Sequence, residues 1–165
     1  MVIKQETSII VGLGEVKITK DVSAILTCLG LGSCIGIAAY DPIAKVAGMA
    51  HIVLPSSAGR NGLASSKYAD VGIPDLLEQV SQQGAITSRL IIKIAGGAQI
   101  SKARGLEDSF KIGEKNADSV RAIFSHLSIS IKASDVGGDY GRTMKIFLES
   151  GNTIVTSAKQ GPKEL

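Results

Sequence analysis

Short apolar runs separated by turn residues dominate the hydrophobic pattern of this chain. Runs rich in Ile, Val and Ala that end at Gly, Pro, Asp or Asn are typical of β-strands. The pattern predicts strands at Ser8–Lys20 (one or two strands, interrupted by Gly12 and Gly14), Val22–Leu29, Ile35–Tyr40, Val46–Leu54, Arg89–Ala95, Ile129–Val136, Thr143–Glu149 and Thr153–Ala158. The polar ending KQGPKEL indicates a frayed C-terminus.

Two segments have the hydrophobic spacing of an amphipathic helix. The first begins near Lys67 and ends at Gly84, and Pro74 interrupts it. Since proline removes a helical hydrogen bond and clashes with the preceding turn, this helix either kinks or begins late, with Pro74 in its first turn. The second helix runs from Glu114 to His126.

The order of strands, helix, strand, helix and strands contains no internal repeat and no linker. It predicts one α+β domain over residues 1–165, with a mixed or mainly antiparallel β-sheet core and about two flanking helices. The glycine-rich residues 56–66 and the dozen residues after Gly97 are expected to form loops.

Composition narrows the class of protein. Hydrophobic residues make up 44% and charged residues 20% of the chain, which is typical of a globular protein. The formal net charge of +3 and the lack of a dense basic cluster argue against a nucleic-acid-binding protein. No apolar stretch approaches the ~18 residues of a membrane span, and the N-terminus has no signal-peptide pattern, so we expect a cytoplasmic protein whose cysteines are thiols.

Several familiar motifs are absent or incomplete. Gly30-Leu31-Gly32 precedes a strand instead of a helix, so a dinucleotide site is rejected. The cysteines and histidines lack the paired spacing of a zinc motif, and we expect neither a metal nor an organic cofactor. Asp135, Asp139 and Arg142 surround a glycine turn, which we interpret as solvated in preference to a contact with a substrate or partner.

The segment from Leu29 to Pro55 predicts a β-hairpin with a candidate site. If Asp41 to Ala44 form a four-residue loop, Tyr40 pairs with Lys45, and Cys34 then faces His51 across the hairpin. Cys34 alone is more simply a small buried residue, and a lone His51 is a hydrogen-bonded core residue. Together they suggest a nucleophile and a base, in which the imidazole lowers the pKa of the thiol and holds a thiolate–imidazolium pair.

An ordered set of segments covers nearly the whole chain: LGLGSC, DP, AHIVLP, KYAD, IAGGA, IGEKN and DVGGDYGR. This set gives the chain a resemblance to the CheD family of chemoreceptor glutamine deamidases. It implies a CheD-like cysteine hydrolase fold with Cys34 as nucleophile and His51 as general acid and base. The family's third catalytic residue is a threonine six positions before the nucleophile, where this chain has Cys28.

Thr27, one residue earlier, is therefore a tentative third member. In a regular strand Thr27 faces away from Cys28, so either a bulge re-aims Thr27 or the third role is filled differently. The resemblance further implies deamidation of glutamines on the cytoplasmic helices of methyl-accepting chemotaxis receptors, through a thioester, without membrane insertion. It also implies binding to a CheC-type phosphatase. The alternatives are a mainly non-catalytic regulatory partner of that phosphatase, or a cysteine hydrolase of other amides or esters.

Overall fold

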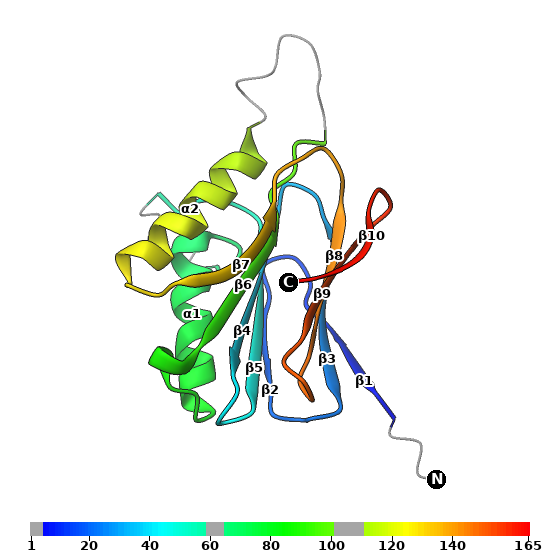
Figure 1. The fold of residues 1–165 in the computed structure, drawn as a ribbon. Coiled ribbons are helices and arrows are strands. Elements are labelled where there is room, and N and C mark those ends of the chain that lie inside the picture. The colour runs from blue at the N-terminus through cyan, green and yellow to red at the C-terminus, as the bar shows by residue number, and fades with distance from the viewer. Residues whose placement is uncertain (1–4, 59–64, 101–110) are drawn as a thin grey trace.

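The protein forms three layers in a computed structural model that describes residues 5–58, 65–100 and 111–165 (Figure 1). Two five-stranded sheets pack face to face, and two helices cover the outer side of one of them. We call these the helix-covered sheet and the outer sheet. Most of each predicted loop, at residues 59–64 and 101–110, lies outside the described residues.

Most neighbouring strands are antiparallel, and the pairs β1–β3 and β6–β7 are parallel. The helix-covered sheet has the order β2 (Val16–Thr19), β5 (Val46–Ile52), β4 (Ile35–Asp41), β6 (Ile91–Gly96) and β7 (Ile131–Val136). The outer sheet has the order β1 (Thr7–Ile10), β3 (Ala24–Leu31), β8 (Arg142–Phe147), β9 (Thr153–Ser157) and β10 (Gly161–Glu164).

Strand β4 shows how alternation builds two cores. Its residues Ile35 and Ile37 pack toward the helices, whereas Ala38 and Tyr40 pack toward the outer sheet. All are buried, because both faces of the helix-covered sheet are occupied. Each apolar side chain that is fully buried contributes about 1.5–3 kcal/mol, so β4 is central to stability.

The helices are α1 (Ala69–Gln82) and α2 (Ile112–His126), with a short 3-10 turn at Thr87–Arg89. Pro74 lies inside α1, so of the two alternatives for this helix the late start, with Pro74 in its first turn, is wrong. Among the described residues, no helix is both long enough and apolar enough to cross a membrane.

The predicted α+β architecture with two helices is confirmed, and two details differ. The segment Ser8–Lys20 divides between the sheets, because β1 joins the outer sheet and β2 joins the helix-covered sheet. The expected frayed C-terminus is wrong, since β10 pairs with β9 and the Lys93 ammonium donates to the Leu165 carbonyl at 2.7 Å. Backbone pairing, which polar residues also make, holds this end in place.

Candidate active site

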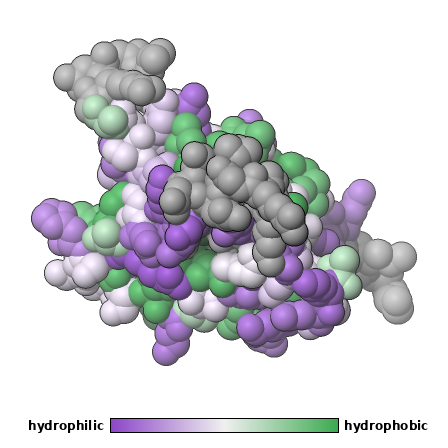
Figure 2. Space-filling view, turned by 90° about the horizontal axis from the view of Figure 1, so that it is seen from above, coloured by the Kyte–Doolittle hydropathy of each residue, from purple (hydrophilic) through white to green (hydrophobic). Residues whose placement is uncertain are grey.

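Cys34 lies directly before β4, where the chain passes from the outer sheet to the helix-covered sheet. Its thiol is partly exposed and borders a hollow of about 390 Å³. The other residues that line it are Gly30, Gly32, Ser33, Ala98, Gln99, Ile100 and Ile112. The β3–β4 connection lies at the upper end of the sheets in Figure 1. Figure 2 views that end from above and shows hydrophobic and hydrophilic residues intermixed.

Two glycines at the end of β6 allow the chain to approach Cys34 closely. Gly96 and Gly97 have φ angles of 117° and 63°, which glycine adopts without strain. A Cβ atom on Gly96 would collide with the Cys34 carbonyl oxygen. The Gly97 N–H donates to that carbonyl at 2.9 Å, and the Ala98 N–H donates to the Gly32 carbonyl at 2.8 Å. These contacts explain why the IAGGA segment has two glycines at this point.

The glycine turn after β7 supports the same segment. The Gln99 N–H donates to the Gly138 carbonyl at 2.9 Å. Arg142 is 3% exposed and forms an ion pair with Asp135 at 3.2 Å, while its guanidinium stacks 4.3 Å from the centre of the Tyr140 ring. The interpretation of this turn as solvated is therefore wrong for Arg142.

His51 lies in β5, and its side chain is 2% exposed. Its Nδ1 lies 3.1 Å from the Val11 carbonyl oxygen. Because a carbonyl can only accept, Nδ1 carries the hydrogen, and Nε2 is the basic nitrogen of the neutral ring. Nε2 has no hydrogen-bond partner among the described residues. Burial lowers the pKa of His51 below its ordinary value of 6.5, so the ring is neutral at pH 7.

The segment between β1 and β2, residues 11–15, crosses from the outer sheet to the helix-covered sheet and holds His51 at three points. We call it the crossing segment. Besides the contact from the ring to Val11, the Gly14 N–H donates to the His51 carbonyl at 2.9 Å. The His51 N–H donates to the Glu15 carbonyl at 3.1 Å. Both the backbone and the ring of His51 are therefore fixed.

The predicted pairing of the hairpin is wrong by two residues. Asp41 is the last residue of β4 and pairs with Val46, so Gly36, not Cys34, lies opposite His51. A shift of two residues preserves the face of each side chain, whereas a shift of one would reverse it. Cys34, directly before β4, packs against the core between the sheets, and His51 shares the face of Ala47 and Met49 in that same core, so the two side chains remain on one face.

Cys28, not Thr27, points toward this face from β3 of the outer sheet. Cys28 is fully buried in the core between the sheets, and its Sγ lies 3.9 Å from the Ala50 carbonyl oxygen. A Cβ atom on Gly36 would make an ordinary contact of 3.6 Å with the Cys28 Cβ and tighter contacts of 3.0 Å with the Leu31 and Met144 side chains. Thr27 has the opposite orientation by alternation, and the irregularity in β3 falls after Cys28, so it does not re-aim Thr27.

Both thiols are neutral at rest. Burial raises the pKa of Cys34 above its ordinary value of 9.0. Burial, together with the Cys34 thiol, raises the pKa of Cys28 to about 12. With a neutral His51, these shifts favour a thiol beside a neutral imidazole, instead of the ion pair expected from the sequence. The imidazole can then act as a general base during attack.

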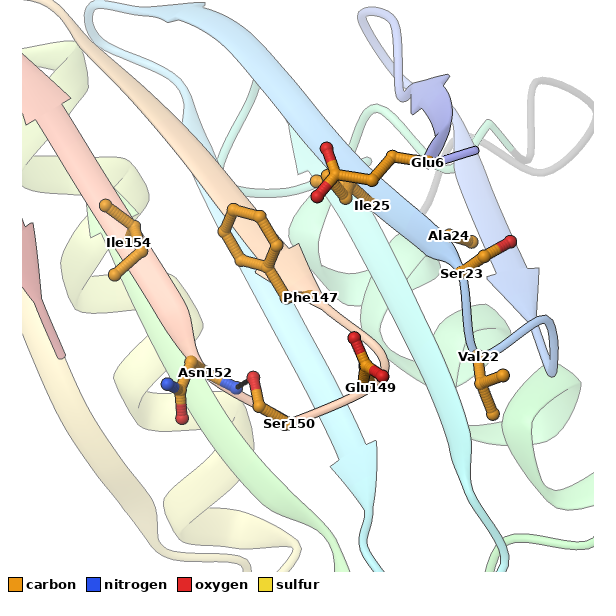
Figure 3. A pocket seen from close by; sticks show the side chains of 10 residues that line it. All are labelled: Glu6, Val22, Ser23, Ala24, Ile25, Phe147, Glu149, Ser150, Asn152 and Ile154. Atoms are coloured by element: carbon orange, nitrogen blue, oxygen red, sulfur yellow. Dashed lines mark hydrogen bonds between the residues drawn. The ribbon is translucent and has the colours of Figure 1, made fainter. Parts of the chain in front are cut away.

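A second hollow of about 360 Å³ lies on the outer sheet (Figure 3). Its walls include Val22 and Ile25 near the start of β3, Phe147 at the end of β8, and Glu6 and Glu149 at its rim. It contains neither cysteine nor histidine, and it lies at the opposite end of β3 from Cys34. Within the described part of the chain, no group of three or more Cys, His, Asp or Glu side chains could hold a metal ion.

Asn116 is a polar residue that the sequence interpretation left without a role. It is fully buried on α2 and contacts the backbone on both sides of the site. The signal was present in the sequence, because Asn116 lies four residues before Val120 and therefore shares the buried helical face. An amide on an apolar face needs hydrogen-bond partners, which predicts a contact with the backbone.

The fold and the site define a class: an α+β protein with a thiol and a basic imidazole on one face of a buried hairpin. A sequence model of the family described as CheD, chemotactic sensory transduction, matches residues 53–157. A relative from Symbiobacterium thermophilum is 43% identical over 94% of this chain and 95% of its own length.

Relatives from Caldanaerobacter subterraneus and Archaeoglobus fulgidus are 44% and 40% identical. They cover 93% and 94% of this chain, and 94% and 96% of their own lengths. All three relatives are named probable chemoreceptor glutamine deamidase CheD. The chain therefore belongs to the CheD family. Among solved structures, a Bacillus licheniformis hypothetical protein, YfiH, is similar over 73% of this chain and 49% of its own, with 14% identity and a TM-score of 0.43.

Proposed function

We propose that the protein is a protein-glutamine deamidase that converts glutamines of methyl-accepting chemotaxis receptors to glutamates. One observation carries the proposal: Cys34 borders an open hollow, and His51, whose Nε2 has no hydrogen-bond partner among the described residues, lies on the same face of the same hairpin. The relatives named as probable chemoreceptor glutamine deamidases support this substrate class.

The reaction begins from a neutral pair. As the Cys34 sulfur attacks the carboxamide carbon, Nε2 of His51 takes the thiol proton, and the carbonyl oxygen becomes an oxyanion. Backbone N–H groups near Ser33 and Cys34 stabilise this charge. Because both groups are neutral at rest, the thiol loses its proton to His51 during the attack and not before it. The rate therefore depends on the position of His51.

The collapse of the tetrahedral intermediate breaks the C–N bond. The His51 imidazolium gives its proton to the nitrogen, which leaves as ammonia and leaves a thioester on Cys34. Nε2 then takes a proton from water as the hydroxide attacks the thioester. When this second tetrahedral intermediate collapses, the sulfur leaves and takes the proton back from the imidazolium, so glutamate forms and the neutral pair is restored. Cys34 supplies the nucleophile of the first step, water supplies that of the second, and His51 supplies the acid and base of both.

Cys28 occupies the third position in this proposal, in place of Thr27. With its pKa near 12, the Cys28 thiol stays protonated throughout the reaction and can direct its S–H toward the Ala50 carbonyl. This carbonyl belongs to the residue before His51. Cys28 would therefore act by packing and a weak hydrogen bond, without exchanging a proton.

Mass spectrometry of a receptor incubated with the protein tests the proposal. The wild-type protein should convert particular receptor glutamines to glutamates and release ammonia, and the Cys34→Ala variant should not. Equal conversion by both proteins would exclude Cys34 as the nucleophile. A panel of amides and receptor methyl esters, assayed in parallel, would show whether another acyl group is the better substrate.

The pH profile of kcat/KM is expected to have its acid limb below pH 6.5. Burial lowers the pKa of His51, and only the neutral ring can take the thiol proton, so activity disappears as the pH falls through this lowered value. Alkylation of Cys34 by iodoacetamide should show the same limb, and the His51→Ala variant should lack it. An acid limb above pH 7 would contradict the assignment of the limb to a buried, neutral His51.

We also propose that the protein binds a CheC-type phosphatase, as its family membership implies. A regulatory role through this partner does not need the thiol. The Cys34→Ala variant should therefore bind the phosphatase with the affinity of the wild-type protein while failing to deamidate receptors. Titration calorimetry measures the first property, and the mass-spectrometric assay measures the second.

A further inference from the structure

One buried amide joins the two strand ends that carry the proposed nucleophile and base. Nδ2 of Asn116 donates to the Ser33 carbonyl and to the Val53 carbonyl, each at 2.9 Å. Ser33 directly precedes Cys34, and Val53 follows His51 by two residues. Asn116 itself is held by α2, a regular helix, so it is a rigid support for both strand ends.

The contact with Ser33 fixes the peptide that contains the Cys34 N–H. In a trans peptide the C=O and N–H groups point in opposite directions. Since the Ser33 carbonyl is directed at Asn116, the Cys34 N–H is directed away from it. Among the described residues, no hydrogen bond outside the helices and strands uses this N–H, and Cys34 precedes β4. As far as the described residues are concerned, this N–H is therefore available to a ligand.

The geometry points to Asn116 as a positioning residue for the deamidase reaction: by holding the Ser33 carbonyl, it aims the Cys34 N–H at the oxyanion of the substrate. The inference rests on the proposed function and adds to it the group that orients an oxyanion donor. Such a donor must be in place before the charge develops, because a peptide that rotates during the reaction would use part of the stabilisation for its own reorientation.

A second contact from the same helix provides a comparison. Ser119 donates its hydroxyl to the Pro55 carbonyl at 2.6 Å, so it also fastens the chain that follows β5. Pro55 is farther along the chain from His51 than Val53 is, and it lies outside the hollow that Cys34 borders. If α2 only stabilised the fold, loss of either contact would affect the reaction similarly.

The test measures deamidation and alkylation in Asn116→Ala, with Ser119→Ala as the matched control. Removal of an oxyanion donor typically lowers kcat about 10²-fold, and we expect a reduction of this size in Asn116→Ala, with KM changed less than about threefold. In the alkylation, the Cys34 sulfur attacks the CH2 carbon of iodoacetamide and displaces iodide, so no oxyanion forms. Alkylation of Cys34 should therefore stay within about threefold of the wild-type rate. Ser119→Ala should retain the wild-type kcat.

The outcomes separate the two proposals. An inactive wild-type protein would overturn the proposed function and this inference with it. An active wild-type protein with an unchanged kcat in Asn116→Ala would overturn the inference alone, as would a loss of alkylation as large as the loss of kcat, because the latter indicates general disorder of the site. Should Asn116→Ala fail to fold, Asn116→Ser keeps one short donor, and the same criteria apply to it.

Discussion

Loss of either Cys34 or His51 is expected to lower kcat for deamidation on the order of 10³-fold or more, and loss of both no further than the larger single loss. In the proposed mechanism, the two side chains act in one proton transfer, from the Cys34 thiol to Nε2 of the His51 ring. Without the nucleophile the base has nothing to activate, and without the base a thiol with a raised pKa is rarely ionised. Rates for Cys34→Ala, His51→Ala and the double variant give the result directly.

His126→Ala is the matched control for the histidine. His126 is the chain's other histidine and lies exposed at the end of α2, so its loss should leave kcat unchanged. If the fold-reduction of kcat in the double variant equals the product of the two single reductions, Cys34 and His51 act in separate steps. Such a result would be incompatible with a shared proton.

Replacing Asp41 by asparagine is expected to lower the free energy of unfolding by about 3 kcal/mol at pH 7. The carboxylate is fully buried, and the Arg89 guanidinium donates to it at 2.8 Å. Backbone N–H groups of Ile43, Ala44 and Ile86 also donate to it, at 2.9 to 3.0 Å. An amide in its place would turn its NH2 group toward one set of these donors.

The effect should depend on pH. Burial opposes the charge of Asp41, but the hydrogen bonds from Arg89 and the backbone outweigh it and hold the pKa of the carboxyl well below its ordinary value of 3.8. The stabilisation is therefore present above pH 3.8 and is lost as the pH falls through the lower pKa of the folded protein. Urea unfolding of wild type and Asp41→Asn should differ most near neutral pH, and the difference should shrink in acid.

Asp139→Asn provides the control. Asp139 and Lys159 form an ion pair at 2.7 Å on the surface, and such exposed pairs contribute only about 0–1 kcal/mol. If Asp41→Asn and Asp139→Asn unfold at the same urea concentration, the hydrogen bonds to Asp41 do not have the stabilising role given to them here.

The sequence pattern predicts most strands and both helices of this fold, because alternation and helical spacing are local properties. It does not predict the division of the strands between two sheets, since alternation shows that a strand has an inner face without showing what covers it. The strand β10 is also missed, because its backbone pairing with β9 involves mostly exposed residues such as Lys163 and Glu164.

The β4–β5 hairpin shows how much of the site can be predicted from the sequence. The face shared by Cys34 and His51 follows from parity along the strands, and the structure confirms it despite a register error of two residues. The error arises because Asp41 is read as a loop residue, whereas its buried hydrogen bonds make it the end of β4. The orientation of Thr27 also follows from parity, but the backbone contacts of Asn116 depend on three-dimensional packing.

The crossing segment couples the alignment of the two sheets to the ring of His51. It spans the seam between the two sheets and is bonded to the backbone and ring of His51, so a sliding of one sheet against the other would act directly on the imidazole. A slip by one strand residue, roughly 3.3 Å, exceeds the reach of the bond from Nδ1 to the Val11 carbonyl. Loss of this hydrogen bond would allow the ring proton of His51 to move from Nδ1 to Nε2. Nε2 would then be a hydrogen-bond donor and could no longer act as a base. The alignment of the two sheets thus sets the tautomer of the His51 ring, and the proposed reaction at Cys34 would depend on the rigidity of both sheets.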